Sequence, residues 1–251
     1  MAGVSRLEFD RVKGLVDNLI FQLMPIGLTG EVSIPGDALQ IGAILSKLQR
    51  FKGLYWFNSH WLPSGMVTTL TSGTGSITWN DYTILLGTGA TSGSYAMASK
   101  THLALGYIPA TWDKKRCFLI ACGPGTSTAQ IIHLVTGTVS SYTAAANTLR
   151  HIGFKIINGV LYGTVADGTT ESTLEITGIG SLTTNRVYEA IFKPASECRF
   201  YVDGVDKGVI TTNLPSTAHG SAQFFFIASV SNTEAADKYI YTYTIRIYQE
   251  E

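Results

Sequence analysis

Aromatic and amide side chains are concentrated in one short segment, YWFNSHW at residues 55–61. Sugar-binding sites commonly combine an aromatic face, on which the apolar face of a sugar ring stacks, with a few amide or carboxylate groups. The segment and the nearby Trp79 therefore predict a glycan-binding surface, with these candidate residues: Trp56, Asn58, His60, Trp61 and Trp79. The alternative, which the usual burial of aromatic side chains favours, is a strand that packs N-terminal helices onto the rest of the protein.

The rest of the sequence lacks a catalytic motif. It has no G-x-S-x-G nucleophile elbow, and its 5 histidines are scattered without HExxH or metal-ligand spacing: His60, His102, His133, His151 and His219. Two glycine-rich segments, GTGATSG at 87–93 and GPGTST at 123–128, lead into no helical pattern. We interpret both as connections between strands, and we expect no catalytic residue and no enzymatic activity.

Charge is sparse and balanced in this chain. Charged residues make up 14% of the 251 residues, with 18 Lys and Arg against 18 Asp and Glu, whereas hydrophobic residues make up 45%. This composition argues against nucleic acid or an anionic membrane as a partner. No run is long enough to span a bilayer and the N-terminus lacks a signal-peptide pattern, so we expect synthesis in a cytoplasm.

The three cysteines form no CxxC pair, which argues against a zinc site. Cys117 and Cys122 are five residues apart, so on one strand they point to opposite faces and cannot bridge each other. A bond from Cys198 to either of them stays open. The sparse and odd number is more typical of buried thiols in a reducing compartment.

Helical patterns are confined to the first 53 residues. Hydrophobic residues repeat there at three- and four-residue spacing, which predicts an amphipathic helix: Val12, Leu15, Val16, Leu19, Ile20 and Leu23. A second helical pattern spans residues 36–51. Two short helices cannot form a core alone, so they pack either on the domain that follows or on other subunits. We interpret residues 1–53 as an oligomerisation or attachment segment that precedes a β domain at 54–251.

From residue 54 onward the hydrophobic pattern alternates with period two, which indicates strands. Turn signals such as Asn158-Gly159 and Asp203-Gly204 separate the segments. We predict strands over residues 54–58, 66–71, 75–79, 82–87, 93–98, 102–107, 116–122, 130–135, 150–157, 160–166, 171–177, 186–192, 197–203, 206–212, 222–228 and 238–249. Many short strands at regular spacing indicate an all-β sandwich or jelly roll.

Two patterns near the C-terminus are especially regular. In residues 197–215, Phe200 and Val202 alternate with polar residues and are expected in the core, while Asp203-Gly204 suits a tight turn. The last predicted strand should lie inside a sheet, paired on both sides, because an exposed edge of that length invites aggregation. Its alternation predicts that one face is core: Tyr239, Tyr241, Tyr243, Ile245 and Ile247.

These C-terminal segments resemble the concanavalin A-like (laminin-G-like) jelly-roll module. The resemblance rests on Tyr201-Val202-Asp203-Gly204 within VYEAIFKPASECRFYVDGVDKGVITTNLPS and on the closing IRIY at 245–248. The segment HIGFKIINGVLYGTVADGTTESTLEITGI at 151–179 is similar to versions of the module found in bacteriophage and viral structural proteins. The resemblance covers residues 100–251 by motif and 54–100 by pattern, and it implies a jelly-roll sandwich preceded by the short helical segment.

The resemblance also suggests which chemistry to look for, because this fold hosts lectins, glycosidases and scaffolding proteins. Its glycosidases carry three acidic residues at alternate positions of one strand. Here Thr173 stands between Glu171 and Glu175, so we expect two solvent-facing glutamates and no hydrolysis. Calcium, a cofactor of related lectins, needs converging oxygen ligands, whereas the candidate aspartates stand alone in turns: Asp81, Asp113, Asp167 and Asp203. We expect no cofactor, with calcium as the alternative.

The resemblance and the helical N-terminus favour a non-enzymatic virion structural protein, namely a phage head fibre, decoration or tail-fibre subunit. Fibres of this type are usually trimers, which implies a homotrimer, other virion proteins as partners of the N-terminal segment, and localisation in the virion. The alternative is a carbohydrate-binding adhesin or receptor-binding protein that recognises host-surface glycans. A glycoside hydrolase is the third and least favoured hypothesis.

Overall fold

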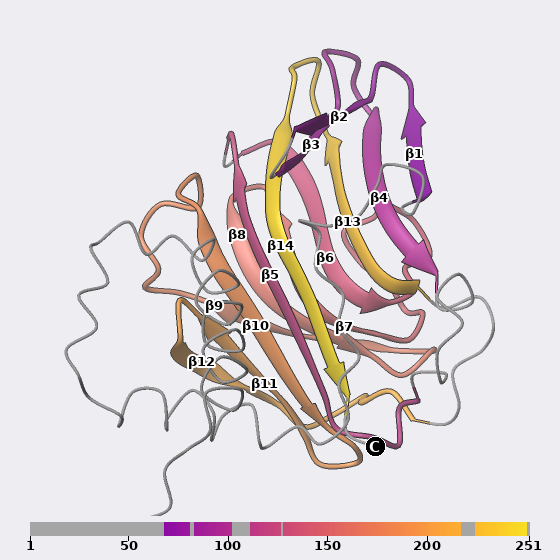
Figure 1. The fold of residues 1–251 in the computed structure, drawn as a ribbon, viewed down its shortest axis with the longest axis vertical. Helices are drawn as coiled ribbons and strands as arrows, with labels where there is room; N and C mark the ends of the chain where they lie inside the picture. The colour runs from indigo at the N-terminus through magenta and orange to yellow at the C-terminus, as the bar shows by residue number, and fades with distance from the viewer. Residues whose placement is uncertain (1–67, 81–82, 102–110, 127, 217–223, 250–251) are drawn as a thin grey trace, which may run out of the picture.

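The computed structural model describes residues 68–80, 83–101, 111–126, 128–216 and 224–249, and these residues form two antiparallel β-sheets packed face to face (Figure 1). Sheet A contains, from edge to edge, β1 (Thr68–Ser72), β4 (Tyr95–Thr101), β13 (Phe224–Asn232), β6 (Gln130–Gly137), β7 (His151–Ile157), β8 (Val160–Ala166) and β9 (Glu171–Ile176). Sheet B contains β12 (Val205–Ile210), β11 (Glu197–Val202), β10 (Arg186–Lys193), β5 (Arg116–Pro124), β14 (Tyr239–Gln249), β3 (Thr83–Gly87) and β2 (Ser76–Asn80). The fold is an all-β jelly-roll sandwich, as the sequence predicts.

Every strand predicted within the described residues is present, with its ends shifted by a few residues at most. The predicted strands 54–58 and 102–107, the helices of the N-terminal segment and the domain boundary at residue 53 lie outside the described residues. The role in oligomerisation or attachment expected for the helix at 12–23 therefore stays a prediction. Among the described residues there is no helix that could span a membrane.

The core lies between the two sheets, where alternate side chains of each strand meet. Phe154 of β7 packs edge-on against Phe200 of β11, with ring centroids 5.4 Å apart. Phe200 and Val202 are buried, as their alternation predicts. The turn after them is formed by Asp203 and Gly204, both with positive φ (52° and 77°), a conformation that Gly adopts without strain. Asp203 also accepts a hydrogen bond from the backbone N–H of Val187 over 2.9 Å, which fixes the hairpin against β10.

Strand β14 departs from the predicted alternation. It is paired on both sides, with β5 and β3, as expected for a strand inside a sheet. However, Thr242 lies opposite Cys122 and Thr244 opposite Ala121, so Tyr243 is an extra residue that forms a β-bulge. The bulge reverses which face each residue occupies. Ile240 and Thr242 are buried before the bulge and Ile245 and Ile247 after it. The prediction that the tyrosines of this strand belong to the core was therefore wrong for Tyr239, Tyr241 and Tyr243, which are only partly buried.

All three cysteines are free and buried, so neither disulfide that the sequence left open is formed. Cys122 and Cys198 belong to the core cluster. Cys117 donates instead to Oε1 of Glu189, with Sγ 3.4 Å from that oxygen. Burial raises the pKa of all three thiols, which keeps them protonated and unreactive.

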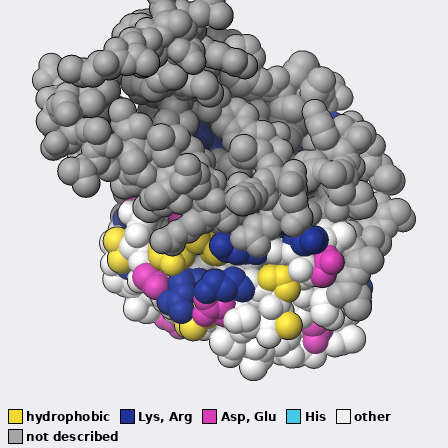
Figure 2. Space-filling model, turned by 60° about the horizontal axis from the view of Figure 1, so that its bottom comes forward, with side chains coloured by type: hydrophobic (Ala, Val, Ile, Leu, Met, Phe, Trp, Pro, Cys, Tyr) yellow, Lys and Arg dark blue, Asp and Glu magenta, His cyan; other side chains and the backbone are white. Residues whose placement is uncertain are grey.

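Charges on the hairpins of sheet B are paired. Arg199 lies between Glu197 and Asp206, at 3.2 Å and 2.8 Å, and Lys193 forms a further ion pair with Glu197. Figure 2 shows one face of the molecule on which lysine and arginine side chains lie beside acidic and hydrophobic ones. The surface drawn there mixes both signs of charge, in keeping with the balanced composition.

Candidate functional site on the outer face of sheet A

The loop at residues 138–150, which joins β6 to β7, lies against the outer face of sheet A. One part of this contact is apolar: Tyr142 packs on a cluster of Met97, Val135, Val139 and Ile227. Its ring centroid is also 5.3 Å from that of Tyr95 at the start of β4. The loop therefore covers a part of the sheet that faces away from the core.

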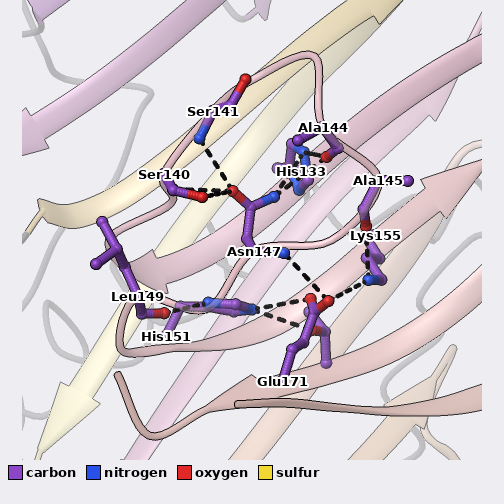
Figure 3. Close-up of polar contacts among 11 residues, drawn as sticks. His133, Ser140, Ser141, Ala144, Ala145, Asn147, Leu149, His151, Lys155 and Glu171 are labelled. Carbon is purple, nitrogen blue, oxygen red and sulfur yellow. Dashed lines mark hydrogen bonds and ion pairs between the residues drawn. The ribbon is translucent and has the colours of Figure 1, made fainter. Parts of the chain in front are cut away.

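The other part of the loop is held by a buried side chain, Asn147 (Figure 3). Its Oδ1 atom accepts hydrogen bonds from the backbone N–H groups of Ser140 and Ser141, over 2.8 Å and 3.0 Å, and from the Ser140 hydroxyl over 2.9 Å. Its amide nitrogen donates to the carbonyl oxygen of Ala144 over 3.2 Å. One asparagine thus bonds Ser140, Ser141 and Ala144 and closes this part of the loop on itself.

Beneath the loop, Glu171 of β9 receives hydrogen bonds on both carboxylate oxygens. Oε2 accepts from Nζ of Lys155 over 2.8 Å and from the backbone N–H of Asn147 over 3.2 Å. Oε1 accepts from the Thr164 hydroxyl over 2.7 Å and lies 3.5 Å from Nε2 of His151. Lys155 also donates to the carbonyl oxygen of Ala145 over 2.7 Å, so the ion pair itself is bonded to the loop.

This environment fixes the charge of the carboxylate. Burial acts to raise the pKa of Glu171, but hydrogen bonds from His151, Lys155 and Thr164, together with the charge of Lys155, outweigh it and lower the pKa to about 2. His133 lies in the same cluster, where its Nε2 atom is 3.2 Å from the carbonyl oxygen of Ala144. Burial, with the nearby charges of His151 and Lys155, lowers the pKa of His133 to about 3 and leaves it neutral.

The register of sheet A explains why these residues meet. Across the sheet, His133 is opposite Lys155, and His151 is opposite Ala166, which is opposite Glu171. The side chains of His151 and Lys155 on β7 and of Glu171 on β9 therefore project from the same outer face of the sheet, on either side of β8. The sequence shows these residues only as scattered charges. The spacing of His151 and Lys155, four apart on one strand, is the only local sign that they share a face.

The surroundings of Glu171 are those of an anchored carboxylate. Glu171 and Glu175 stand four residues apart on one strand with Thr173 between them, and Glu171 accepts hydrogen bonds from Lys155, Thr164 and the backbone N–H of Asn147. A carboxylate with a pKa of about 2 is also a poor proton donor near neutral pH. The expectation that both glutamates face solvent was wrong for Glu171, whose side chain is 8% exposed, and right for Glu175.

Of the candidate glycan-binding residues, only Trp79 lies in the described part of the chain. It stands on β2, partly buried, and packs against the hydrophobic core. Trp56, Asn58, His60 and Trp61 lie outside the described residues, so their role stays a prediction.

Within the described ranges, no group of three or more His, Cys, Asp or Glu residues is placed to hold a metal ion. Asp167 accepts hydrogen bonds from Thr169 and Thr170 of its own turn, and Asp203 pairs with Arg186. Asp113 is exposed, and Asp81 lies outside the described residues. The absence of a cofactor, with calcium as the alternative, stays a prediction.

No family model matches the sequence, and no curated protein matches it. Among solved structures, the chain is similar to a protein of unknown function from Shewanella oneidensis MR-1, with 13% identity, a TM-score of 0.52, and coverage of 82% of this chain and 93% of that one. It is also similar to Bacillus licheniformis beta-glucanase, with 12% identity, a TM-score of 0.55, and coverage of 78% of this chain and 98% of the glucanase chain.

A third similar structure is of botulinum neurotoxin type C, described as depending on interaction with two ganglioside molecules to enter cells. The identity is 10%, the TM-score is 0.51, and the match covers 82% of this chain but 50% of the toxin chain. At such identities these likenesses show the fold alone. They support a jelly-roll sandwich of the concanavalin A-like kind.

Proposed function

We propose that this protein is a non-enzymatic jelly-roll subunit that recognises carbohydrate. The observation that carries the non-enzymatic part is the state of Glu171, which accepts hydrogen bonds from Lys155, Thr164 and the backbone of Asn147 and lies beneath the loop at 138–150. A carboxylate held in this way anchors a loop, and Thr173 stands where glycosidases of this fold have the middle acidic residue of the strand.

Two of the similar structures support carbohydrate as the ligand class. One is a beta-glucanase, and the other is described as interacting with gangliosides, which carry sugars. Because Glu171 is engaged in holding the loop at 138–150, the sandwich has the properties of a binding module. The sugar is held and released unchanged.

The display of this module on a virus particle is the second part of the proposal. The sequence of residues 151–179, which is similar to jelly-roll modules of bacteriophage and viral structural proteins, supports a fibre or decoration subunit. In this role the N-terminal segment at residues 1–53 joins three copies and attaches them to other virion proteins. Host-surface glycans are then the ligands.

Two experiments test these parts separately. The full chain is applied to an array of bacterial-surface and animal glycans, where we expect concentration-dependent binding to a subset of them. An array without a single signal contradicts carbohydrate recognition.

The fibre role is tested by the oligomeric state. Multi-angle light scattering at micromolar concentration should give the mass of a trimer. A monomer with residues 1–53 intact contradicts the fibre role and leaves glycan recognition untouched.

A further inference from the structure

A pair of tyrosines lies on the outer face of sheet B, on the first half of β14 (the upper part of the sheet in Figure 1). Ile240 and Thr242 are fully buried, so Tyr239 and Tyr241, which alternate with them, point away from the core and are partly exposed. Their rings meet edge to face, with centroids 5.4 Å apart and an angle of 80° between the planes. The two partly exposed rings therefore form an aromatic corner on this face of the sheet.

The glycines of the segment GPGTST provide the space for this corner. A Cβ atom on Gly125 would lie 2.0 Å from the ring of Tyr239, so the ring rests directly on the glycine backbone. A Cβ atom on Gly123 would lie 2.1 Å from Oδ1 of Asn185, so this side chain also lies close to the strand. Asn185 is exposed, and its amide nitrogen donates to the hydroxyl of Tyr243 over 2.9 Å. Because neither glycine carries a side chain, Tyr239 and Asn185 can lie directly on the backbone of these two residues.

A carboxylate lies at the other side of the rings. Oδ1 of Asp237 accepts a hydrogen bond from the backbone N–H of Gly89 over 2.8 Å. The same oxygen is 3.8 Å from where a Cβ atom of Gly87 would stand, and Gly87 is opposite Tyr239 in the sheet register. Asp237 is exposed, so its carboxylate is available to accept hydrogen bonds from a ligand.

We propose that Tyr239, Tyr241, Asn185 and Asp237 form a shallow site for a neutral oligosaccharide. An aromatic corner flanked by an amide and a carboxylate is the combination that binds a sugar, since the rings stack on its apolar face and the polar groups bond its hydroxyls. The positions that flank the rings in the register are uncharged, which disfavours sialylated or sulfated chains: Ser76, Thr78, Leu85, Gly87 and Gly123. This assignment rests on the proposed carbohydrate recognition and gives it a location.

The test is isothermal titration calorimetry of the full chain with neutral hexasaccharides of glucose, of mannose and of galactose, and with sialyllactose. We expect binding of at least one neutral hexasaccharide and weaker binding of sialyllactose. Tyr241→Ala and Asn185→Ala should each weaken the binding at least about tenfold, the size of effect expected for a central contact. Tyr201→Ala is the matched control, because Tyr201 is a partly exposed tyrosine on β11 of the same sheet. Circular dichroism melting checks that each variant is folded.

The outcomes separate this site from the general proposal. If the wild-type chain binds a saccharide and folded Tyr241→Ala binds it equally well, the site is wrong while carbohydrate recognition stands. A loss of binding in Trp61→Ala alone would place the site in the segment at 55–61 instead. If no saccharide binds and Tyr241→Ala reduces self-association, the corner is an interface between copies of this chain, and the sugar site is overturned.

Discussion

The Nζ atom of Lys155 lies 2.8 Å from Oε2 of Glu171, and the two side chains are only 4% and 8% exposed. The residues belong to β7 and β9, on either side of β8, and both bond the loop at 138–150. The charges therefore serve two purposes: they neutralise each other on a covered sheet face, and they hold the loop that covers it.

Replacing Glu171 by Gln leaves the ammonium of Lys155 buried without a counter-charge. Breaking a buried ion pair by removing one partner costs about 3 kcal/mol, so Glu171→Gln should lower the free energy of unfolding in urea by about that amount. Glu175→Gln is the control, because Glu175 stands exposed on the same strand face and should change the stability by no more than about 0.5 kcal/mol. Equal stabilities for the two variants contradict the anchoring role of Glu171.

Acid should weaken the fold through the same cluster, beginning with His133. Its pKa is lowered from 6.5 to about 3 in the folded state, so below pH 6.5 the unfolded chain takes up a proton that the folded one does not. The contribution that neutral His133 makes to the stability of the fold is present in full above pH 6.5 and is lost progressively as the pH falls toward 3. In His133→Gln the slope of unfolding free energy against pH within this window should be smaller by up to about 1.4 kcal/mol per pH unit. Urea midpoints measured from pH 7.5 to 4 provide the slopes, and identical slopes contradict a buried neutral His133.

Glu171 contributes at lower pH. Its pKa is lowered from 4.5 to about 2, so the stability that its charge provides is complete above pH 4.5 and is lost as the pH falls toward 2. Glu171→Gln should therefore remove part of the decline in the urea midpoint between pH 4.5 and 3. A decline as steep as that of the wild-type chain would show that other carboxylates cause it.

Asn147 should control the order of the loop. Asn147→Ala leaves the N–H groups of Ser140 and Ser141 without their acceptor, at an expected cost of about 2 kcal/mol. Amide hydrogen exchange at those two serines should accelerate, while exchange in the core strands keeps its order of protection. Thr148→Ala, at an exposed neighbouring position, serves as the control. Unchanged exchange at Ser140 and Ser141 contradicts the role of Asn147.

The strands could be predicted from the sequence because period-two alternation and turn residues are local signals, as in the hairpin of Phe200, Val202 and Asp203-Gly204. The faces of β14 could not, since an extra residue at Tyr243 reverses the alternation and no local signal announces a bulge. The cluster around Glu171 is likewise a product of register: Lys155 and Asn147 become its partners only when strands and loop are assembled. The tyrosine corner was missed for the same reason: without the bulge, Tyr239 and Tyr241 were assigned to the core face of β14.

The central claim is that this jelly-roll protein binds carbohydrate without cleaving it. The most direct measurement incubates the full chain with an oligosaccharide that it binds on the array and records, in one sample, the bound fraction and the release of new reducing ends. The account predicts saturable binding with the oligosaccharide recovered intact. New reducing ends, released by the wild-type chain and abolished in Glu171→Gln under conditions where that variant is folded, would contradict it.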